Sequence, residues 1–582
     1  MPARLLARYV RRYARWYLAG FGFVALASLC SLAIPWMVKR AIESLEAGGA
    51  REELWWYVVA ILILAGSHGL VRLGSRFVIH GAGQRIESDL RNDLYTHLQA
   101  LPLAFYQTHH TGDLMSRASN DVSTVKLLVG FGTLSLMGTA LAFAGALIAM
   151  LAIDPWLTLY AMAPYPLVIL LARRFASVVH RRAQAIQEQL GLLSAKVQEN
   201  LTGAAVVRAY TMEAREVARF DGLNGEYLTR SLALALTQAG FSPLIGLIGG
   251  MGTLIILWLG GMAVVDGRIS LGGFVAFNGY LAHLVWPTIA LGWTLSVVRR
   301  ALSAMERIGQ VLAIEPEIED PKTGANLPSP AEVRSLSVEF RRLTFAYSGR
   351  GAALREVTLT IPGGSTVAIV GPTGSGKSTL GALIPRLFNA SPGTVFVDGR
   401  DVRTIPLCDL RQAVGYVPQE PFLFSRSIRD NLALAGPQLG EAAIRRAAEL
   451  VGLAGEVESF PEGWETVVGE RGLTLSGGQR QRAALARALL RDPRILILDD
   501  AFASVDAAKE GEILRGLREA VSGRTVLVIT HRLRAAREAD WIVVLDEGRI
   551  VDQGTHGDLL AREGLYARLW RLGQLEEELE RA

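Results

Sequence analysis

The sequence predicts an all-α membrane domain of six helices fused to an α/β domain. Three observations lead to this fold class. Of the 582 residues, 50% are hydrophobic and 20% charged, the long uncharged runs lie only in the first half of the chain, and a glycine-rich phosphate-binding motif stands in the second half. A wholly soluble enzyme carries more charge than this. The two cysteines, Cys30 and Cys408, are too few for a disulfide framework or a zinc site.

Six uncharged segments predict membrane-spanning helices, because about 20 apolar residues cross a bilayer core of about 30 Å. Any one of the shorter runs, taken alone, also fits a buried core helix. Their succession through the first half of the chain excludes that reading for the set, so we predict a transmembrane domain over residues 1–315. The six segments are residues 19–38, 54–71, 127–153, 155–172, 231–265 and 269–298.

Basic residues indicate how these spans are oriented. Arginine and lysine cluster before the first span and in the links after the second and fourth spans, whereas the alternate links hold few. The positive-inside rule then places both termini in the cytoplasm, at a cytoplasmic (inner) membrane, and accounts for the net charge of +5 without a nucleic-acid partner. Arginines spaced three and four apart over residues 4–15 predict an amphipathic elbow helix in the headgroup layer; an ordinary solvated helix is the alternative.

The two long cytoplasmic links are helical in pattern, so we expect the spanning helices to continue beyond the bilayer. Short connecting helices are expected where the chain reverses, near residues 102–112 and 209–216. Residues 316–334 are rich in proline and acidic residues and predict a linker. Over residues 335–582, β-branched runs alternate with helical stretches, which is typical of an α/β domain with parallel strands.

A predicted strand leads directly into a phosphate loop, which is followed by a helix. Glycines allow backbone N–H groups to surround a phosphate, Lys377 reaches the outer phosphates and Ser378 ligates Mg²⁺. A second apolar strand ends in Asp499, which is expected to hold the same ion. The predicted ATP contacts of the loop are Gly371, Pro372, Thr373, Gly374, Ser375, Gly376, Lys377, Ser378 and Thr379.

A second anion site is predicted in the same domain. Ser476, Gly477, Gly478 and Gln479 precede a strong helix-forming segment, so they lie at a helix N-terminus, where backbone N–H groups and the helix dipole favour an anion. One bound nucleotide does not need two such sites on one chain. The simplest interpretation is that this loop faces a nucleotide held by another chain.

The segment Leu-Ser-Gly-Gly-Gln at 475–479, between a phosphate loop and an aspartate-ended strand, resembles the signature of ATP-binding cassette domains. With six predicted spans before it, the whole chain resembles a half-transporter of the ABC exporter family, of the multidrug and peptide exporter type. The resemblance implies ATP-driven export of an amphipathic or hydrophobic drug, peptide or lipid. It also implies a dimer in which each of two ATP molecules lies between one chain's phosphate loop and the other chain's signature loop.

The resemblance also assigns roles to single residues. Tyr347 matches the aromatic residue that stacks on adenine, and Gln419 matches the glutamine that senses Mg²⁺ and faces the membrane domain. His531 matches the histidine that contacts the γ-phosphate, and Asp506 matches the aspartate of the loop that crosses the dimer interface. Without the family, Tyr347 fits an edge-strand aromatic and His531 a helix cap. The two predicted connecting helices match the family's coupling helices in position.

One catalytic position departs from the family pattern. The family usually has glutamate after the magnesium aspartate, where it polarises the attacking water; here the residue is Asp500. A carboxylate withdrawn by one methylene predicts a site that binds ATP and hydrolyses it slowly, because catalytic groups tolerate little displacement. The interface loop at 503–506 also differs. An impaired site beside an intact signature loop favours one subunit of a heterodimer; a homodimer in which aspartate suffices is the alternative.

The sequence does not specify the substrate. Gln238, Asn278 and His283 lie in the later spans, where polar side chains line cavities or join helices by hydrogen bonds. A lipid flippase and a nucleotide-gated membrane regulator are alternative functions. The expected partners are a second half-transporter subunit, membrane lipid and the transported molecule.

Overall fold

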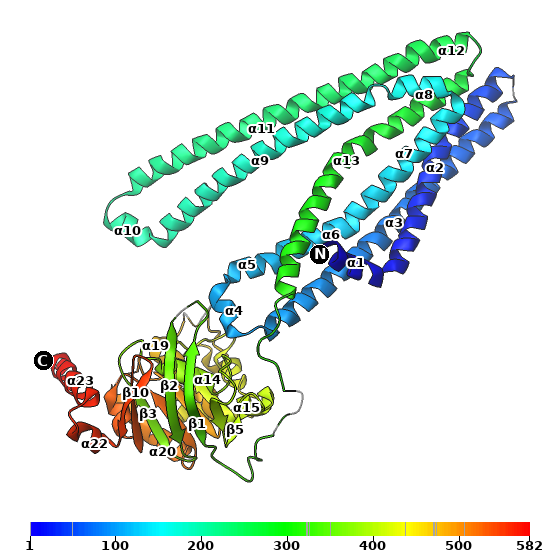
Figure 1. Cartoon of the computed structure of the whole chain (residues 1–582). Coiled ribbons are helices and arrows are strands. Elements are labelled where there is room, and N and C mark those ends of the chain that lie inside the picture. Colours follow the sequence, from blue (N-terminus) through cyan, green and yellow to red (C-terminus); the bar gives the residue numbers. More distant parts are fainter. Residues whose placement is uncertain are drawn as a thin grey trace. The chain divides into compact units, whose positions relative to one another are not determined.

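The structure is a computed structural model of the full chain (Figure 1). It describes residues 2–48, 50–321, 324, 326–349, 351–436, 438–469, 472, 474–505 and 507–581. The chain forms two compact units. One comprises Met1–Leu98 and Gly112–Ile314, and the other comprises Gln99–Thr111 and Glu315–Ala582.

The first unit is helical throughout. Helix α13 packs against α2 and α7, and α9 packs against α11. By length, α3 rises about 75 Å, more than twice a bilayer core, so it extends well beyond the bilayer as expected. The main helices are α1 (Pro2–Arg12), α2 (Ala14–Glu46), α3 (Arg51–Ala100), α7 (Thr133–Ile153), α8 (Pro155–Met162), α9 (Tyr165–Thr202), α11 (Glu213–Ile255), α12 (Gly261–Val265) and α13 (Leu271–Leu312).

All six predicted spans lie on helices. Among the described residues, three helical stretches are long and apolar enough to cross a membrane, namely Ala14–Glu46, Arg51–Ala100 and Thr111–Ile153. The other three predicted spans lie on α8 and α9, on α11 and α12, and on α13, and each includes side chains outside the described residues.

Local chemistry sets the reversals between the helices. Asp154 ends α7 in an extended conformation and caps α8 by accepting a hydrogen bond from the Leu157 N–H at 2.9 Å, with Pro155 in the first turn. Ser270 caps α13 in the same way, accepting from the Gly273 N–H at 3.0 Å. Each cap allows a new helix to begin, because it satisfies a backbone donor that the first turn of that helix leaves free.

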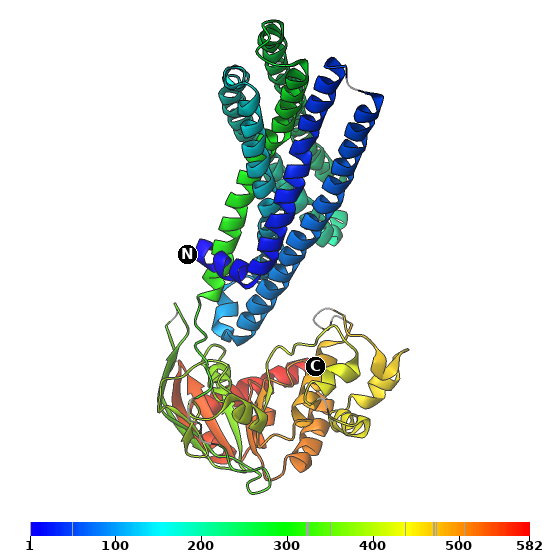
Figure 2. The ribbon, with the colours of Figure 1, turned by 90° about the vertical axis from the view of Figure 1, so that its right-hand side faces the viewer.

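The N-terminal helix α1 lies across the bundle (Figure 2). Its tyrosines hold it to α3: the Tyr9 hydroxyl donates to Asp93 at 2.7 Å and the Tyr13 hydroxyl, in the turn after α1, donates to Asp89 at 2.9 Å. A helix thus lies in the segment where the elbow helix is predicted, and polar contacts fix it to a neighbouring helix.

The helices α9 and α11 lie side by side and diverge from the rest of the first unit toward α10 (Ala204–Ala209) (Figure 1). In the part of the chain that the structure describes, α10 buries no side chain. The second connecting helix was expected at 209–216 and lies earlier. The chain leaves α9 at Gly203 and turns again at Thr211, where φ is +53°, so the reversal itself is completed before α11 begins.

The second unit contains two sheets. Its six-stranded sheet has the order β10-β9-β3-β8-β7-β6, with β9, β3, β8, β7 and β6 parallel and β10 antiparallel; the four-stranded antiparallel sheet has the order β2-β1-β4-β5. Central strands such as β7 and β8 are buried at every residue, as their continuous apolar sequences require. The strands are β1 (Val338–Ala346), β2 (Ala352–Ile361), β3 (Thr366–Val370), β4 (Val395–Val397), β5 (Arg400–Asp401), β6 (Val414–Val417), β7 (Ile495–Asp499), β8 (Thr525–Ile529), β9 (Trp541–Asp546) and β10 (Arg549–Gly554).

The first connecting helix, α4 (Leu103–Thr108), belongs to this second unit. Phe105 is 7% exposed, and Ala104 packs against the core cluster that includes both sheets' apolar residues. The predicted domain boundary assigns this segment to the transmembrane domain of residues 1–315. Its apolar face instead packs with residues more than 200 positions later, a contact that local sequence pattern does not reveal.

Candidate nucleotide site

The phosphate loop connects β3 to α14 (Lys377–Leu383), in the predicted order of strand, loop and helix. Gly376 caps α14 with a φ of +99°, and a Cβ at this position would lie 2.5 Å from the Ala353 carbonyl oxygen. Only glycine fits there without displacing the backbone. The loop is therefore built to expose backbone N–H groups at a helix N-terminus, which suits a phosphate.

Lys377 supplies the positive charge of this loop. Its Nζ donates to the carbonyl oxygens of Gly371 at 2.9 Å and Pro372 at 2.8 Å. Burial lowers the pKa of Lys377, while the nearby carboxylates of Asp500 and Asp499 act in the opposite direction. The ammonium group is thus held over the loop and shares its surroundings with two acids.

Asp499 ends β7 beside the phosphate loop. The Ser378 hydroxyl donates to Asp499 Oδ1 at 2.8 Å, and the Tyr416 hydroxyl donates to Oδ2 at 3.3 Å. Burial raises the pKa of Asp499, and the two hydrogen bonds oppose this effect. Sequence reasoning missed Tyr416. The sequence did contain one indication of its role, which is a tyrosine hydroxyl in β6, the strand that pairs with β7.

The Asp500 carboxylate contacts the other two residues that are predicted to be catalytic. Its Oδ2 lies 2.9 Å from His531 Nδ1 and 3.4 Å from Gln419 Nε2. Asp500 has a φ of +51°, a left-handed conformation that aspartate tolerates better than most residues. Its N–H donates to the Ile529 carbonyl at 2.8 Å, which joins the end of β7 to β8. The three side chains predicted to be catalytic therefore meet at one carboxylate.

Tyr347 lies beside the same loop. Its hydroxyl is 3.0 Å from Thr379 Oγ1, and its ring makes edge contacts with Phe345 and Phe388, each with centroids 5.1 Å apart. These contacts place the predicted adenine-stacking residue next to the phosphate loop and give its ring a fixed aromatic support.

The predicted signature loop begins helix α19 (Gly477–Leu489). Ser476 and Gln479 form a capping box: the Ser476 hydroxyl accepts from the Gln479 N–H at 3.2 Å and the Gln479 side chain accepts from the Ser476 N–H at 2.8 Å. A Cβ at Gly478 would lie 2.8 Å from the Ser504 carbonyl oxygen. The two glycines therefore let α19 start in close contact with the loop at 503–505.

Glu456, which sequence reasoning missed, supports this loop from α18 (Ala454–Glu458). It accepts hydrogen bonds from Gln479 at 3.0 Å and from Arg482 at 2.7 and 2.9 Å, and it pairs with Lys509. The Arg482 hydrogen bonds, followed by those from Lys509 and Gln479, lower the pKa of Glu456 to about 2. No local motif reveals it, because the contacts join segments far apart in the sequence.

The structure does not bring the phosphate loop and the signature loop together. The phosphate loop follows β3, whereas the signature loop lies against Ser504, in the loop that follows β7, two strands away in the sheet. The helix α19 that it begins packs on β6, α16 (Ile428–Ala433) and α17 (Glu441–Leu450). Strands lie about 4.8 Å apart, so β3 and β7 are about 10 Å apart. Asp506, predicted at the dimer interface, lies outside the described residues.

The donor set beside the loop fits Mg²⁺. Ser378 and Asp499 supply a hydroxyl and a carboxylate oxygen 2.8 Å apart, and the Gln419 side chain is nearby at Asp500. Within the described residues, no cluster of three or more histidine, cysteine or acidic side chains suits a metal ion. One carboxylate with a hydroxyl is what Mg²⁺ uses when phosphate oxygens complete its shell, so this arrangement fits magnesium better than zinc.

Comparisons with known proteins agree with this architecture. Residues 17–288 match the ABC transporter transmembrane region, and residues 354–503 match the ABC transporter family. The chain is 34% identical to an ATP-dependent lipid A-core flippase of Syntrophus aciditrophicus over 99% of this chain and 95% of the relative. It is also 34% identical to the multidrug resistance-like ATP-binding protein MdlA of Escherichia coli, over 99% of this chain and 97% of the relative.

A solved structure shares the fold over nearly the whole chain. It is a bacterial Atm1-family ABC exporter with ATP bound, with a TM-score of 0.80, 27% sequence identity, and coverage of 96% of this chain and 98% of that one. A helical transmembrane domain is thus joined to an ATP-binding cassette domain in the arrangement that was expected. The chain belongs to the ABC transporter family, as a half-transporter of the exporter type.

Proposed function

We propose that the chain is one half of an ATP-driven exporter that moves an amphipathic or hydrophobic substrate across the cytoplasmic membrane by alternating access. In this proposal its own nucleotide site is slow, and its signature loop completes the site of a partner subunit. The observation that carries the proposal is the Asp500 site, where a shortened acid stands at the meeting point of His531 and Gln419.

The proposed slow hydrolysis follows from the short side chain of Asp500. Aspartate is one methylene shorter than the glutamate usual in the family, which withdraws the carboxylate by about 1.3 to 1.5 Å, and a displacement of about 1 Å costs up to about a hundredfold in rate. The hydrogen-bond partners of Asp500 hold it at the end of β7, so it does not gain that reach by moving.

The separation of the two loops supports a dimer. A nucleotide on the phosphate loop that follows β3 is proposed to need a second anion site from another chain, because this chain's α19 begins against the loop at 503–505, after β7, and shares no hydrogen bond with the phosphate loop among the described residues. The diverging pair α9 and α11 supports the same conclusion, since these helices and α10 present many exposed apolar side chains. An intact signature loop beside an altered acid favours a heterodimer.

In this site Ser378, Asp499 and Gln419 are the residues that would hold Mg²⁺. When bound, the ion supplies charge neutralisation at the phosphate oxygens. Lys377 then holds the outer phosphates and Tyr347 supports the adenine ring. Asp500 orients water, while His531 fixes the direction of that carboxylate.

The proposed substrate class is inferred from the names of similar proteins. One relative is named as a lipid A-core flippase and another as multidrug resistance-like, so amphipathic molecules are the class we propose. A lipid flippase is the second candidate. Uphill ATP-dependent flux of a drug, peptide or labelled lipid into inside-out vesicles tests export, and nucleotide-dependent conductance without uphill flux would indicate a gated regulator instead.

The partner and the slow site are tested together. We expect the chain to purify from native membranes with a different half-transporter; recovery only with copies of itself would contradict the heterodimer. We expect Asp500→Glu to raise steady-state ATP hydrolysis by up to about a hundredfold at this chain's site. An unchanged rate would contradict the slow-site proposal.

A further inference from the structure

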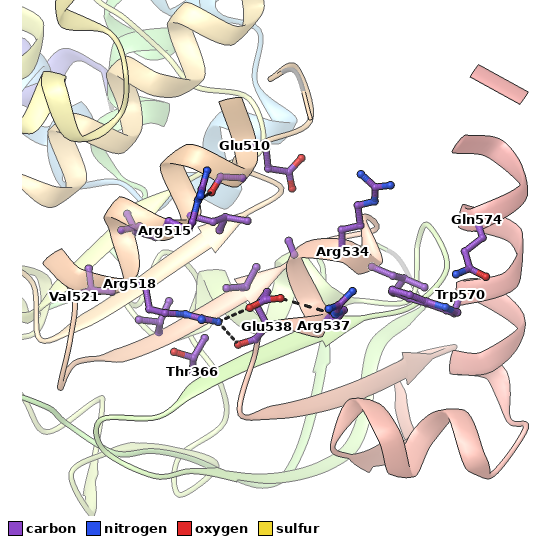
Figure 3. Close-up of a pocket in the computed structure, with 18 residues that line it drawn as sticks. Thr366, Glu510, Arg515, Arg518, Val521, Arg534, Arg537, Glu538, Trp570 and Gln574 are labelled. Atoms are coloured by element: carbon purple, nitrogen blue, oxygen red, sulfur yellow. Dashed lines mark hydrogen bonds and ion pairs between the residues drawn. The ribbon is translucent and has the colours of Figure 1, made fainter. Parts of the chain in front are cut away.

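The cassette unit contains a cavity that the nucleotide site does not use. It has a volume of about 720 Å³ and lies between α20 (Ala507–Ala520), α21 (Leu533–Arg537) and α23 (Leu565–Arg581) (Figure 3). Small-molecule sites typically enclose 300–1,000 Å³. The size is therefore that of a site for a small organic ligand.

The cavity lies at a seam between two hydrophobic clusters. Leu517, Val521 and Val528 belong to the cluster that includes α19 and β7, whereas Leu533 belongs to a neighbouring cluster on the same face of the parallel sheet, against which Trp570 packs. The two clusters leave a space between them here. The walls of the cavity are therefore partly apolar and suit the apolar part of a ligand.

The rim of the cavity is basic. Four arginines and two glutamates line it, which gives a formal charge of +2. Glu538 is shared by Arg518 at 2.8 Å and Arg537 at 3.9 Å (Figure 3). The other glutamate pairs with Arg532, which lies outside the lining. Arg515, which donates to the Gly511 carbonyl oxygen at 3.2 Å, and Arg534, which lies near Glu510, also line the cavity.

We propose that this cavity binds an amphipathic organic anion, whose apolar part lies against the walls and whose acidic head lies among the rim arginines. Apolar walls alone favour a neutral hydrophobic ligand, and arginines alone favour a small inorganic anion. Only a molecule with both parts uses both features, because guanidinium groups form strong charge-assisted hydrogen bonds with carboxylates and phosphates.

The cavity is connected to the loops around the nucleotide site. Glu510 lines it and pairs with Arg532 at 3.1 Å, and Arg532 donates to the carbonyl oxygens of Ala503 at 2.8 Å and Val505 at 3.1 Å. Arg532 also follows His531 directly in the sequence. An occupant that braces α20 against α21 would thus act on the loop at 503–505 and on His531, and change ATP turnover.

The test measures binding of decanoate to the full-length complex in lipid nanodiscs by isothermal titration calorimetry. Decanol tests the apolar part without the charge, and acetate tests the charge without the apolar part. We expect decanoate to bind at least about tenfold more tightly than either. Equal affinities of decanoate and decanol would mean partition into lipid only and would overturn the proposal.

Two variants locate the site. Gly573 lines the cavity, and an added Cβ there meets no atom within 4 Å, so Gly573→Leu fills the space without a clash at the backbone. The matched control is Gly557→Leu on α22 (His556–Ala561), which also has open space and lies outside the cavity. Arg515→Gln removes a rim charge, with Arg568→Gln on α23 as its control.

We expect both cavity variants to weaken decanoate binding at least about tenfold and both controls to leave it unchanged. We also expect decanoate to change ATP turnover of the parent complex and not of Gly573→Leu. Binding that is the same in all four variants would overturn the site. If Gly573→Leu does not fold, Arg515→Gln and its control decide the result. Binding without any change in turnover would overturn the connection to the nucleotide site.

Discussion

The carboxylate of Glu456 is predicted to stabilise the cassette domain and to hold its signature helix. It bonds to Gln479 and Arg482 and pairs with Lys509, and these partners lower its pKa from 4.5 to about 2. A difference of about 2.5 in pKa corresponds to about 3 kcal/mol. The Glu456 side chain is 29% exposed, so solvent screening reduces the contribution to about 2 kcal/mol.

The perturbation is Glu456→Gln, which keeps the shape and removes the charge. Arg482 is 6% exposed, so the variant leaves a buried guanidinium without its carboxylate. We expect the free energy of unfolding to fall by about 2 kcal/mol and the unfolding temperature of the cassette domain to fall by about 4–8 °C. Differential scanning calorimetry of the purified complex at pH 7 measures both.

A control variant and the pH dependence of stability distinguish the Glu456 contribution from that of an ordinary surface ion pair. Glu458→Gln, two residues later, removes an exposed pair with Arg445 at 3.6 Å, and such surface pairs contribute about 0–1 kcal/mol. Because the folded-state pKa of Glu456 is depressed, its contribution is present above pH 4.5 and is lost as the pH falls toward 2. Equal unfolding temperatures for Glu456→Gln and Glu458→Gln at pH 7 would refute the reasoning.

Three further predictions concern the nucleotide sites. Lys377→Ala is expected to lower nucleotide occupancy at this chain's site at least about tenfold, measured by photocrosslinking of 8-azido-ATP, because it removes the cation of the phosphate loop; unchanged labelling would count against that role. Tyr416→Phe is expected to raise about fivefold the Mg²⁺ concentration needed for half-maximal nucleotide binding, because one hydrogen bond of about 1 kcal/mol to Asp499 is lost; an unaltered Mg²⁺ titration would show that this hydroxyl does not position the acid. Gly478→Ala is expected to destabilise the cassette domain by about 1–3 kcal/mol and to slow hydrolysis at the partner's site, since its Cβ would meet the Ser504 carbonyl oxygen at 2.8 Å; calorimetry and the ATPase rate measure the two effects, and parent values in both would contradict the close contact.

The parts of the fold that local sequence determines were predictable. The phosphate loop lies between β3 and α14, and the signature loop caps α19, because glycine conformation and helix capping depend on neighbouring residues. The uncharged runs likewise marked helices, since hydropathy is a property of each segment.

Contacts between distant segments were not predictable in the same way. Glu456 reaches the signature helix from α18, and Tyr416 reaches Asp499 from the neighbouring strand. The packing of α4 with the second unit and the divergence of α9 and α11 also depend on which apolar faces meet. Periodicity shows that a face is apolar and leaves open what covers it.

The measurement that tests the central proposal most directly is the state of the nucleotide held at this chain's own site during turnover. The purified complex is allowed to turn over 8-azido-ATP labelled at the α-phosphate, crosslinked, and each subunit's nucleotide is released and separated. We predict that this chain retains the triphosphate, because in our proposal Asp500 positions water poorly, while the partner's site, which we propose is completed by this chain's signature loop, carries diphosphate. Diphosphate in equal proportion at both sites would contradict the proposal.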